Sequence, residues 1–502
     1  MSYKIVEELQ SSHERKPASE LPPPSPPSEE GKKTSRPQPV PRLVSLDAYR
    51  GFIMILLAAS GFGLGRMARQ PEESRLWELV SRDQFERLAF HFDHPPWQSN
   101  YAYGSLDARE GNPWMRFKVS FWDLIQPAFM FMVGVAMPFS YRRREGVGQS
   151  PWKRTIHATV RAVVLISLGV FLYSQQYEST NWIFTNVLAQ IGLGYFFVYL
   201  LAQRPHWMQV TGFAVILVGT WIGVHVYEPP PLGEIELNRE TMNRQELLEQ
   251  IGSAYDPEEV NASYEKAEIF APPYQQWSKN GNAFHDFDVW ALNVLPRPQS
   301  DDPFLFNGGG YQTLNFVPSM ATMLLGLFCG QLLLSAVPPR RKFFYLVGGA
   351  LGCLALGVAA GATCCPIVKR IWTPAWVLFS GGYVMGMLAL FYLLFDLLPL
   401  KRMAFPLVVV GMNSIFVYMT GQLARTWLAD KVVDIHFGWA ISRLLERIAE
   451  PIGATKVWGV DSIEAGKILA DVFEPLITSV SALAVIWLLC YWLYRQRIFI
   501  RI

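Results

Sequence analysis

The stretch FDHPPW (Phe92–Trp97) places one histidine before two prolines and a tryptophan, just outside an apolar block. An imidazole titrates near neutral pH, so His94 is able to take a proton from an attacking nucleophile. Asp123, in FWDLIQP, opens the next apolar block and is either a helix N-cap or a carboxylate that orients a histidine. The opposing interpretation of His94 is structural, in which the prolines stiffen a loop that Trp97 buries.

A metal site is the weaker alternative for this stretch. His91 and His94 have the spacing of two ligands on a helix, with Asp93 between them, but the prolines favour a loop. The sequence places no third ligand, and the five cysteines lie in or beside apolar blocks without a ligand or disulfide pattern. We therefore expect no metal cofactor.

Other polar residues lie in apolar blocks, where they need a partner. Asp47 and Arg50, in SLDAYRG, are three residues apart and are able to pair on one helix face, unless Ser45 or Asp47 simply caps the helix. Asn315 and Asn413 lie within later blocks, where they either line a cavity or bond one helix to another.

The composition indicates the elements that position these residues. The chain of 502 residues is 51% hydrophobic and only 17% charged, whereas a soluble chain carries about 25% charged residues. Its apolar residues form blocks of about 20, the length that crosses a bilayer as a helix. We predict an all-α polytopic membrane protein with about ten transmembrane helices, near 46–66, 121–141, 157–175, 182–202, 207–227, 313–335, 343–363, 373–396, 404–424 and 474–494.

The basic residues predict the orientation, because Lys and Arg concentrate in cytoplasmic loops. With both termini cytoplasmic, six separate clusters fall on the inner side. These are Arg36, Arg42 and Arg50; Arg142, Arg143, Arg144, Lys153 and Arg154; Arg204; Arg340, Arg341 and Lys342; Lys401 and Arg402; and Arg495, Arg497 and Arg501.

The remaining segments are a tail and three long outer loops. Residues 1–42 are predicted to be a disordered cytoplasmic tail, since 17–41 contains nine prolines and no aromatic residue. Residues 43–502 form the membrane domain, with outer loops at 67–120, 228–312 and 425–472. The loops are rich in aromatic residues and predict a substrate-facing mouth, although long loops also simply tolerate insertions.

Seven motifs in chain order resemble the heparan-α-glucosaminide N-acetyltransferase family, in its bacterial form. They cover about residues 42 to 425. In order, they are RLVSLDAYRGFIMILL, FDHPPW, FWDLIQPAFMFMVGVAMPFS, TNVLAQIGLGYF, YQTLNFVPSMATMLLGLFCG, IWTPAWVLFSGGY and GMNSIFVYMTGQ.

The resemblance implies transfer of an acetyl group from cytoplasmic acetyl-CoA to an amino sugar, or a sugar hydroxyl, on the outer side. It assigns His94 as the catalytic histidine, either a general base or a transient acetyl carrier, with Asp123 beside it. Basic residues at the inner mouth would hold the phosphates of the donor. The expected donor-binding residues are Asp47, Arg50, Arg142, Arg143 and Arg144, and the expected acceptor-binding residues are Trp97, Ser60, Asn315 and Asn413.

The chain departs from the family pattern in two places. A segment of 23 residues, Gln98 to Ser120, separates the histidine motif from the next helix, where family members have a short link. Ser60 stands where family members often carry an asparagine, and a hydroxyl does not replace an amide's donor and acceptor at that reach. The inserted segment and the long loop at 228–312 are expected to reshape the acceptor site, so for a bacterial protein we expect an acceptor other than heparan sulfate.

Two other classes of function remain open. A transporter of a small sugar-like solute would suit the spans and amides without any acyl transfer, and a scaffold would use only the loops and tail. The expected partners are membrane lipid and a small-molecule or oligosaccharide acceptor, without nucleic acid, and a homodimer is one candidate assembly. The implied location is a bacterial inner (plasma) membrane.

Overall fold

The computed structural model describes residues 42–94, 119–175, 177–230, 270, 273–296, 298 and 303–500. The described part is helical, without a strand, which confirms the all-α prediction. Residues 1–41 of the predicted tail, residues 95–118 of the first outer loop, which include Trp97, and much of the outer loop at 228–312 lie outside the described residues.

Among the described residues, eight stretches of helix are long and apolar enough to cross a membrane. The first combines α1 (Val44–Ala58), the turn η1 (Ser60–Gly63) and α2 (Leu64–Ala68). The others are α6 (Phe121–Gly146), α7 (Pro151–Ser174), α9 (His206–His225), η5 and α14 (Thr313–Asn315 and Phe316–Leu334), α15 (Pro339–Thr363), α16 with η6 (Pro374–Tyr392 and Leu393–Leu397) and α23 (Glu474–Arg495).

The other two predicted spans coincide with helices of a different kind. The apolar helix α8 (Val187–Ala202) is shorter than the rest, and α17 (Phe405–Gly411) and α18 (Ser414–Leu423) form a pair bent by 78°. The membrane-spanning character is therefore supported, while the count of ten and the orientation stay predictions.

Close helix contacts at glycines hold the centre of the bundle together. A Cβ at Gly134 of α6 would lie 1.9 Å from the Met323 carbonyl oxygen of α14, and one at Gly326 of α14 would lie 2.0 Å from that of Phe131. Only glycine allows this approach of α6 to α14 from both sides. The start of α6, which carries Asp123, is thereby fixed against the bundle.

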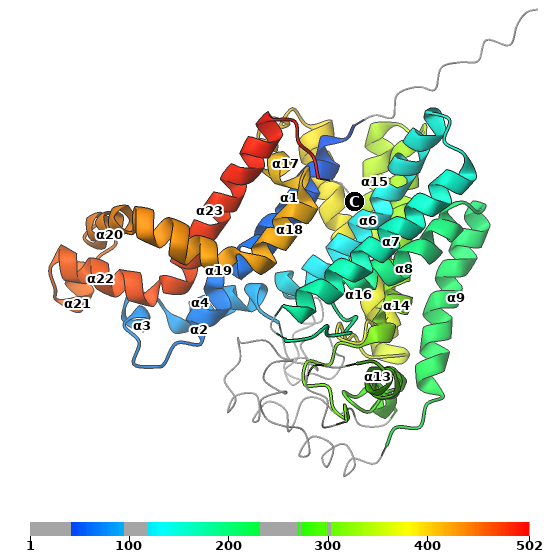
Figure 1. The fold of residues 1–502 in the computed structure, drawn as a ribbon, viewed down its shortest axis with the longest axis horizontal. Helices are drawn as coiled ribbons and strands as arrows, with labels where there is room; N and C mark the ends of the chain where they lie inside the picture. Colours follow the sequence, from blue (N-terminus) through cyan, green and yellow to red (C-terminus); the bar gives the residue numbers. More distant parts are fainter. Residues whose placement is uncertain are drawn as a thin grey trace, which may run out of the picture. The chain divides into compact units, whose positions relative to one another are not determined.

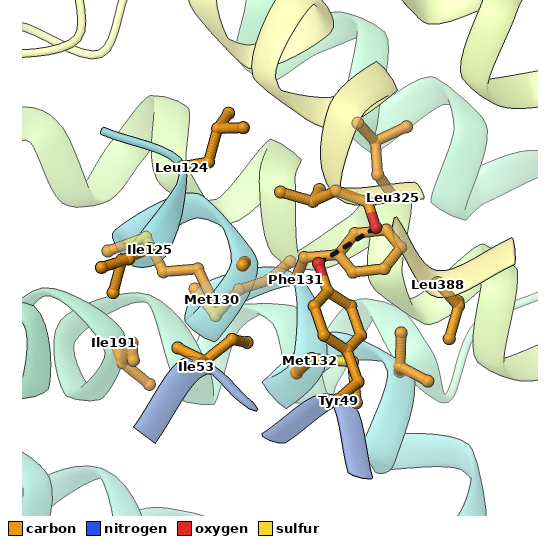
Figure 2. Packing of buried hydrophobic residues seen from close by; sticks show 14 of the residues in the cluster. Tyr49, Ile53, Leu124, Ile125, Met130, Phe131, Met132, Ile191, Leu325 and Leu388 are labelled. Carbon is orange, nitrogen blue, oxygen red and sulfur yellow. Dashed lines mark hydrogen bonds between the residues drawn. The ribbon is translucent and has the colours of Figure 1, made fainter. Parts of the chain in front are cut away.

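Large side chains fill the space between these helices. Figure 2 shows Tyr49 of α1 pointing into a cluster with Met130 and Phe131 of α6 and Leu388 of α16. Tyr49 is fully buried, and its hydroxyl donates to the Val384 carbonyl at 3.1 Å, so this polar group is satisfied. This core therefore packs α1, α6 and α16 together, which are the first, second and eighth predicted spans.

The predicted outer loop at 425–472 is instead helical, and in Figure 1 it forms an arm beside the lower end of α23. It contains α19 (Arg425–Trp427), η7 (Leu428–Asp434), α20 (Ile435–Ala449), α21 (Ala454–Trp458) and α22 (Ser462–Val472). Leu445 and Ala449 of α20 pack on Leu469 of α22 and on Trp458 in a small core of their own. Short amphipathic helices lack the continuous apolar run that marks a span, which is why the hydropathy pattern missed them.

The segments before α6 and between α9 and α14 carry short helices. They are α3 (Leu76–Leu79), α4 (Arg82–Ala89), η2 (Phe90–Phe92), η4 (Gln275–Trp277) and α13 (Ala283–Val294). His94 lies in the segment before α6, and Tyr311 lies in the segment between α9 and α14. Both residues lie at the same end of the bundle.

Candidate active site

His94 follows η2 and is positioned through its neighbour Asp93. The Asp93 carboxylate accepts from the His94 backbone N–H at 2.8 Å and forms an ion pair with Arg69. The Asp93 carbonyl accepts from the Ser120 hydroxyl at 2.7 Å, just before α6 begins. These contacts tie the end of η2 to α2 on one side and to α6 on the other.

A left-handed turn at the end of α1 supports the same segment. Ser60, Gly61, Phe62 and Gly63 all have positive φ, from 45° to 69°, a conformation that costs a non-glycine residue about 1 kcal/mol or more. A Cβ at Gly61 would lie 2.8 Å from the Phe92 carbonyl oxygen. Ser60 therefore lies in the turn that supports the histidine segment, which is the place the sequence predicted for it.

Two charged side chains from other segments meet at His94. Its Nδ1 lies 2.6 Å from Oδ1 of Asp123, and the same carboxylate oxygen accepts from the Lys369 ammonium at 2.9 Å. The side chains of Asp123 and Lys369 are each only 5% exposed, whereas that of His94 is 32% exposed. The histidine is thus the member of the cluster that a substrate is able to reach.

The hydrogen bonds assign the protons on the imidazole. The Trp122 indole N–H donates to Nε2 of His94 at 3.1 Å, so Nε2 is an acceptor and Nδ1 carries the proton that Asp123 accepts. Burial and the positive charge of Lys369 lower the pKa of His94 below its ordinary value, outweighing Asp123. His94 is therefore neutral near pH 7, with Nε2 as its basic nitrogen.

Lys369 is a site residue that the sequence analysis did not select. Burial alone would lower the pKa of Lys369, but the Asp123 carboxylate and Tyr311 raise it overall, so it remains an ammonium. A signal was present, because Lys369 and Arg370 follow a span on the predicted outer side, where basic residues are uncommon.

Residues of the segment that leads into α14 lie beside the His94 cluster. The Tyr311 ring lies 6.4 Å from the His94 ring, and the Lys369 ammonium lies 5.5 Å from the Tyr311 ring. The Asn315 amide donates to the Arg370 carbonyl at 2.6 Å, which brings this predicted residue beside the Lys369 segment. Within the described part of the chain, the fully buried Gln312 amide has no hydrogen-bond partner for its oxygen or nitrogen.

Asn413 lies at the other end of α1 from this site. It is fully buried at the α17–α18 break, donates to the Ile498 carbonyl at 3.3 Å and accepts from the Ile500 N–H at 2.9 Å. Gly411, two residues earlier, packs on Asp47 at the start of α1. From Asp47 to the turn at Gly61 is about 21 Å along the helix, so Asn413 holds the C-terminal segment instead of contacting the histidine site.

The residues predicted to bind the donor have protein partners at that same end. Asp47 accepts from Arg42 at 2.8 Å, and α1 is capped by the Asp396 carboxylate, which accepts from the Val44 and Ser45 N–H groups at 3.1 Å each. Asp47 thus forms an ion pair with Arg42, and neither Ser45 nor Asp47 is the N-cap, which is Leu43.

The three arginines at the end of α6 differ in their contacts and exposure. Arg142 donates to the Leu334 carbonyl at 3.4 Å, Arg143 is exposed, and Arg144 contacts Gln149 at 3.2 Å and His157.

Arg161 is a second residue that sequence reasoning missed, although an arginine inside an apolar block is itself a signal. It donates to the Tyr195 hydroxyl at 3.3 Å, and its guanidinium lies 4.7 Å from the Tyr195 ring centroid. Its buried Nε has no hydrogen-bond partner among the described residues. Tyr195 in turn shares a hydrogen bond with Tyr141 at 3.0 Å. Between α6, α7 and α8 there is thus a positive, partly unsatisfied polar cluster.

Among the residues that the structure describes, no group of three or more histidine, cysteine, aspartate or glutamate residues is arranged to hold a metal ion. The cluster at His94 has instead the parts of an acid–base site, namely a basic nitrogen, a carboxylate behind it and a cation that neutralises the carboxylate.

A comparison with known protein families gives a match over part of the chain. The family described as heparan-alpha-glucosaminide N-acetyltransferase, catalytic, matches residues 101–247. That range contains Asp123, Trp122 and Arg161, while His94 and Lys369 lie outside it. No curated protein matches the chain. The match agrees with the resemblance seen in the seven motifs, and it supports a relationship of residues 101–247 to the heparan-alpha-glucosaminide N-acetyltransferase family.

Proposed function

We propose that the chain is a transmembrane acetyltransferase that moves an acetyl group from cytoplasmic acetyl-CoA to an amino sugar, or a sugar hydroxyl, on the outer side. The observation that carries this proposal is the His94–Asp123 pair, in which Nδ1–H faces the carboxylate at 2.6 Å and Nε2 is the basic nitrogen. The match of residues 101–247 to the family model supports acetyl transfer as the class of reaction.

As a general base, His94 acts through Nε2. The acceptor nitrogen attacks the thioester carbonyl carbon while Nε2 takes the acceptor proton. The tetrahedral intermediate then expels the thiolate, and the proton on Nε2 passes to sulfur, which leaves an amide and a free thiol. Asp123 stabilises the imidazolium that forms, in the manner of a triad carboxylate. The same nitrogen would attack the thioester if His94 carried the acetyl group itself.

Lys369 has a positioning role in this scheme. Its ammonium balances the charge of the buried Asp123 and favours the neutral imidazole, which is the form that accepts a proton. A neutral base at the operating pH is the form that general-base catalysis requires.

The donor is expected to enter from the opposite end of α6. Tyr141 lies 18 residues beyond Asp123 on this helix, a distance of about 27 Å. Arg161 beside Tyr195 and Tyr141 offers a guanidinium with an unsatisfied Nε in that region, and guanidinium groups suit phosphates. We therefore assign the diphosphate of acetyl-CoA to Arg161 in preference to Arg142, Arg143 or Arg144.

The test is release of CoA from acetyl-CoA by the purified full chain, with a panel of amino sugars and neutral sugars. Release is expected to depend on an acceptor and to vanish in His94→Ala. The matched control is His91→Ala, because His91 is exposed and three residues away. Solute flux in proteoliposomes without acetyl-CoA, unaffected by His94→Ala, would instead support a transporter and would refute the proposal.

A further inference from the structure

Two consecutive residues at the start of α6 bind both nitrogens of the His94 ring. Asp123 faces Nδ1, and Trp122 donates its indole N–H to Nε2 at 3.1 Å. The Trp122 and His94 rings meet edge to face, with centroids 6.1 Å apart. The tryptophan therefore occupies the nitrogen that the proposed reaction needs.

The support behind Trp122 holds it in that place. Its ring lies beside the left-handed turn, since a Cβ at Gly61 would lie 3.5 Å from it. The neighbouring Phe121 packs edge to face on Phe52 of α1, at 5.8 Å between ring centroids. The indole is only half-buried, so it has an exposed side toward which it is able to turn.

We infer that Trp122 is a reversible cap on Nε2 of His94, which suppresses hydrolysis of the acetyl donor until an acceptor displaces the indole. This inference rests on the proposed function. An uncapped Nε2 would take a proton from water, whose oxygen would attack the thioester carbonyl and release acetate and the free thiol. The cap slows this hydrolysis, because displacing the indole loses its hydrogen bond to Nε2. An acceptor offsets that loss with its own contacts to the site, whereas water does not.

The expected strength of the cap is modest, as a switch requires. A hydrogen bond within a protein contributes about 1 kcal/mol net, which corresponds to about a fivefold change in the fraction of uncapped nitrogen. An acceptor that makes two or three such bonds displaces the indole readily.

The test uses Trp122→Phe and Trp122→Tyr, which keep an aromatic ring but remove the indole N–H. The first measurement is the rate at which diethyl pyrocarbonate modifies His94, read by peptide mass spectrometry at pH 7.5. Both variants are expected to be modified about fivefold faster than the unmodified chain. Trp221→Phe is the control, since that indole donates at 3.0 Å to the Cys364 carbonyl, away from His94.

The pH profile of the same modification separates capping from mere access. The groups that face the His94 ring are Asp123 from α6, Lys369 and Arg370 from the segment before α16, and Tyr311 from the segment before α14. None of them changes in the variants. Loss of the N–H that binds Nε2 is expected to move the midpoint to higher pH, because that bond stabilises the neutral ring.

The second measurement is CoA release from acetyl-CoA without an acceptor. The ratio of this rate to the rate with an acceptor is expected to be about fivefold higher in both variants than in the unmodified chain. Modification rates and a pH midpoint equal to those of the unmodified chain in both variants would overturn the cap. If the unmodified chain turns over no acetyl-CoA, the proposed function fails, while the modification experiment still decides whether Trp122 caps the nitrogen.

Discussion

Lys369 donates to the Asp123 carboxylate at 2.9 Å, although 246 residues separate the two in the chain. Both side chains are almost completely buried, so each is the other's principal charge partner in a site with little solvent. His94 lies against this pair, with its Nδ1 3.2 Å from the ammonium. The charge state of the histidine therefore depends on a residue from a distant loop.

Removing that cation is expected to shift the pH dependence of the enzyme. Lys369→Met deletes a charge that lowers the pKa of His94, so this pKa rises. The base is active when neutral, and the acidic limb of the kcat/KM profile is therefore expected to move to higher pH. The variant also leaves Asp123 buried without its cation, which costs about 3 kcal/mol of stability.

The measurement is the pH profile of acceptor-dependent CoA release between pH 5 and pH 9. Lys401→Met is the control, because Lys401 is exposed in the turn between η6 and α17. An acidic limb at the same pH in Lys369→Met and in the unmodified chain would refute the role given to Lys369.

The left-handed turn at the end of α1 is expected to control the position of His94. Gly61→Ala meets two penalties, a positive φ of 61° and a Cβ 2.8 Å from the Phe92 carbonyl oxygen. The backbone conformation costs about 1 to 2 kcal/mol, and the clash displaces the segment that carries His94. We expect kcat to fall by roughly tenfold or more.

A matched control separates the two penalties. Gly148 also has a positive φ, of 75°, but a Cβ there would have no atom within 4 Å. In a thermal melt, Gly148→Ala should therefore lose only the stability that the backbone conformation costs, while its kcat stays unchanged. Equal kcat in both variants would show that the turn does not position the histidine.

Asp288 in α13 is expected to make stability depend on pH. Burial raises its pKa to about 7, against the hydrogen bonds that it accepts from Thr313. The folded chain then holds a proton that the unfolded chain, with an ordinary pKa near 3.8, has released. This contribution to stability is complete below about pH 4, declines as pH rises from 4 to 7 and is constant above pH 7.

Asp288→Asn removes that titration. The Tm of the variant minus the Tm of the unmodified chain should therefore increase as pH rises from 4 to 7. Taking the difference at each pH also cancels His285, whose pKa burial lowers to about 4. That histidine acts in the opposite direction, because the unfolded chain takes up its proton first as pH falls below 6.5. A difference in Tm that does not vary with pH would contradict the prediction.

Arg161 is expected to act on donor binding and not on the chemical step. Arg161→Met removes the guanidinium that donates to Tyr195, and KM for acetyl-CoA should rise about tenfold, the loss of roughly one charge-assisted hydrogen bond. The kcat should change little. Steady-state kinetics at varied acetyl-CoA test this, with Arg143→Ala beside it because Arg143 is exposed. If KM for acetyl-CoA rises in Arg143→Ala but not in Arg161→Met, the donor phosphates bind at the end of α6 and not at Arg161.

The sequence predicted local features well, because each depends on residues that are neighbours in the chain. Apolar blocks marked the helices, and the pattern around Asp123 marked the start of α6. The suggestion that Asp123 orients a histidine agrees with its 2.6 Å contact to His94, only 29 residues away.

What the sequence did not reveal depends on long-range contacts or on breaks in a pattern. Lys369 reaches Asp123 only after α15 and α16 have packed, and no local pattern reports such a pairing. The amide of Asn413 binds backbone at 498–500, so an amide in an apolar block turned out to hold two segments together. Arg161 was different, since its position within a predicted span was visible in the sequence.

The turn that supports His94 also has a consequence for biosynthesis. A Cβ at Gly63 would lie 2.4 Å from the carbonyl oxygen of Pro475, so the end of the first span is shaped to the start of the last helix. The ribosome adds Pro475 about 380 residues after His94, roughly 20 to 80 s later. A nascent chain therefore inserts its first spans with the histidine segment lacking part of its support, and catalytic competence is acquired only after Pro475 has been added.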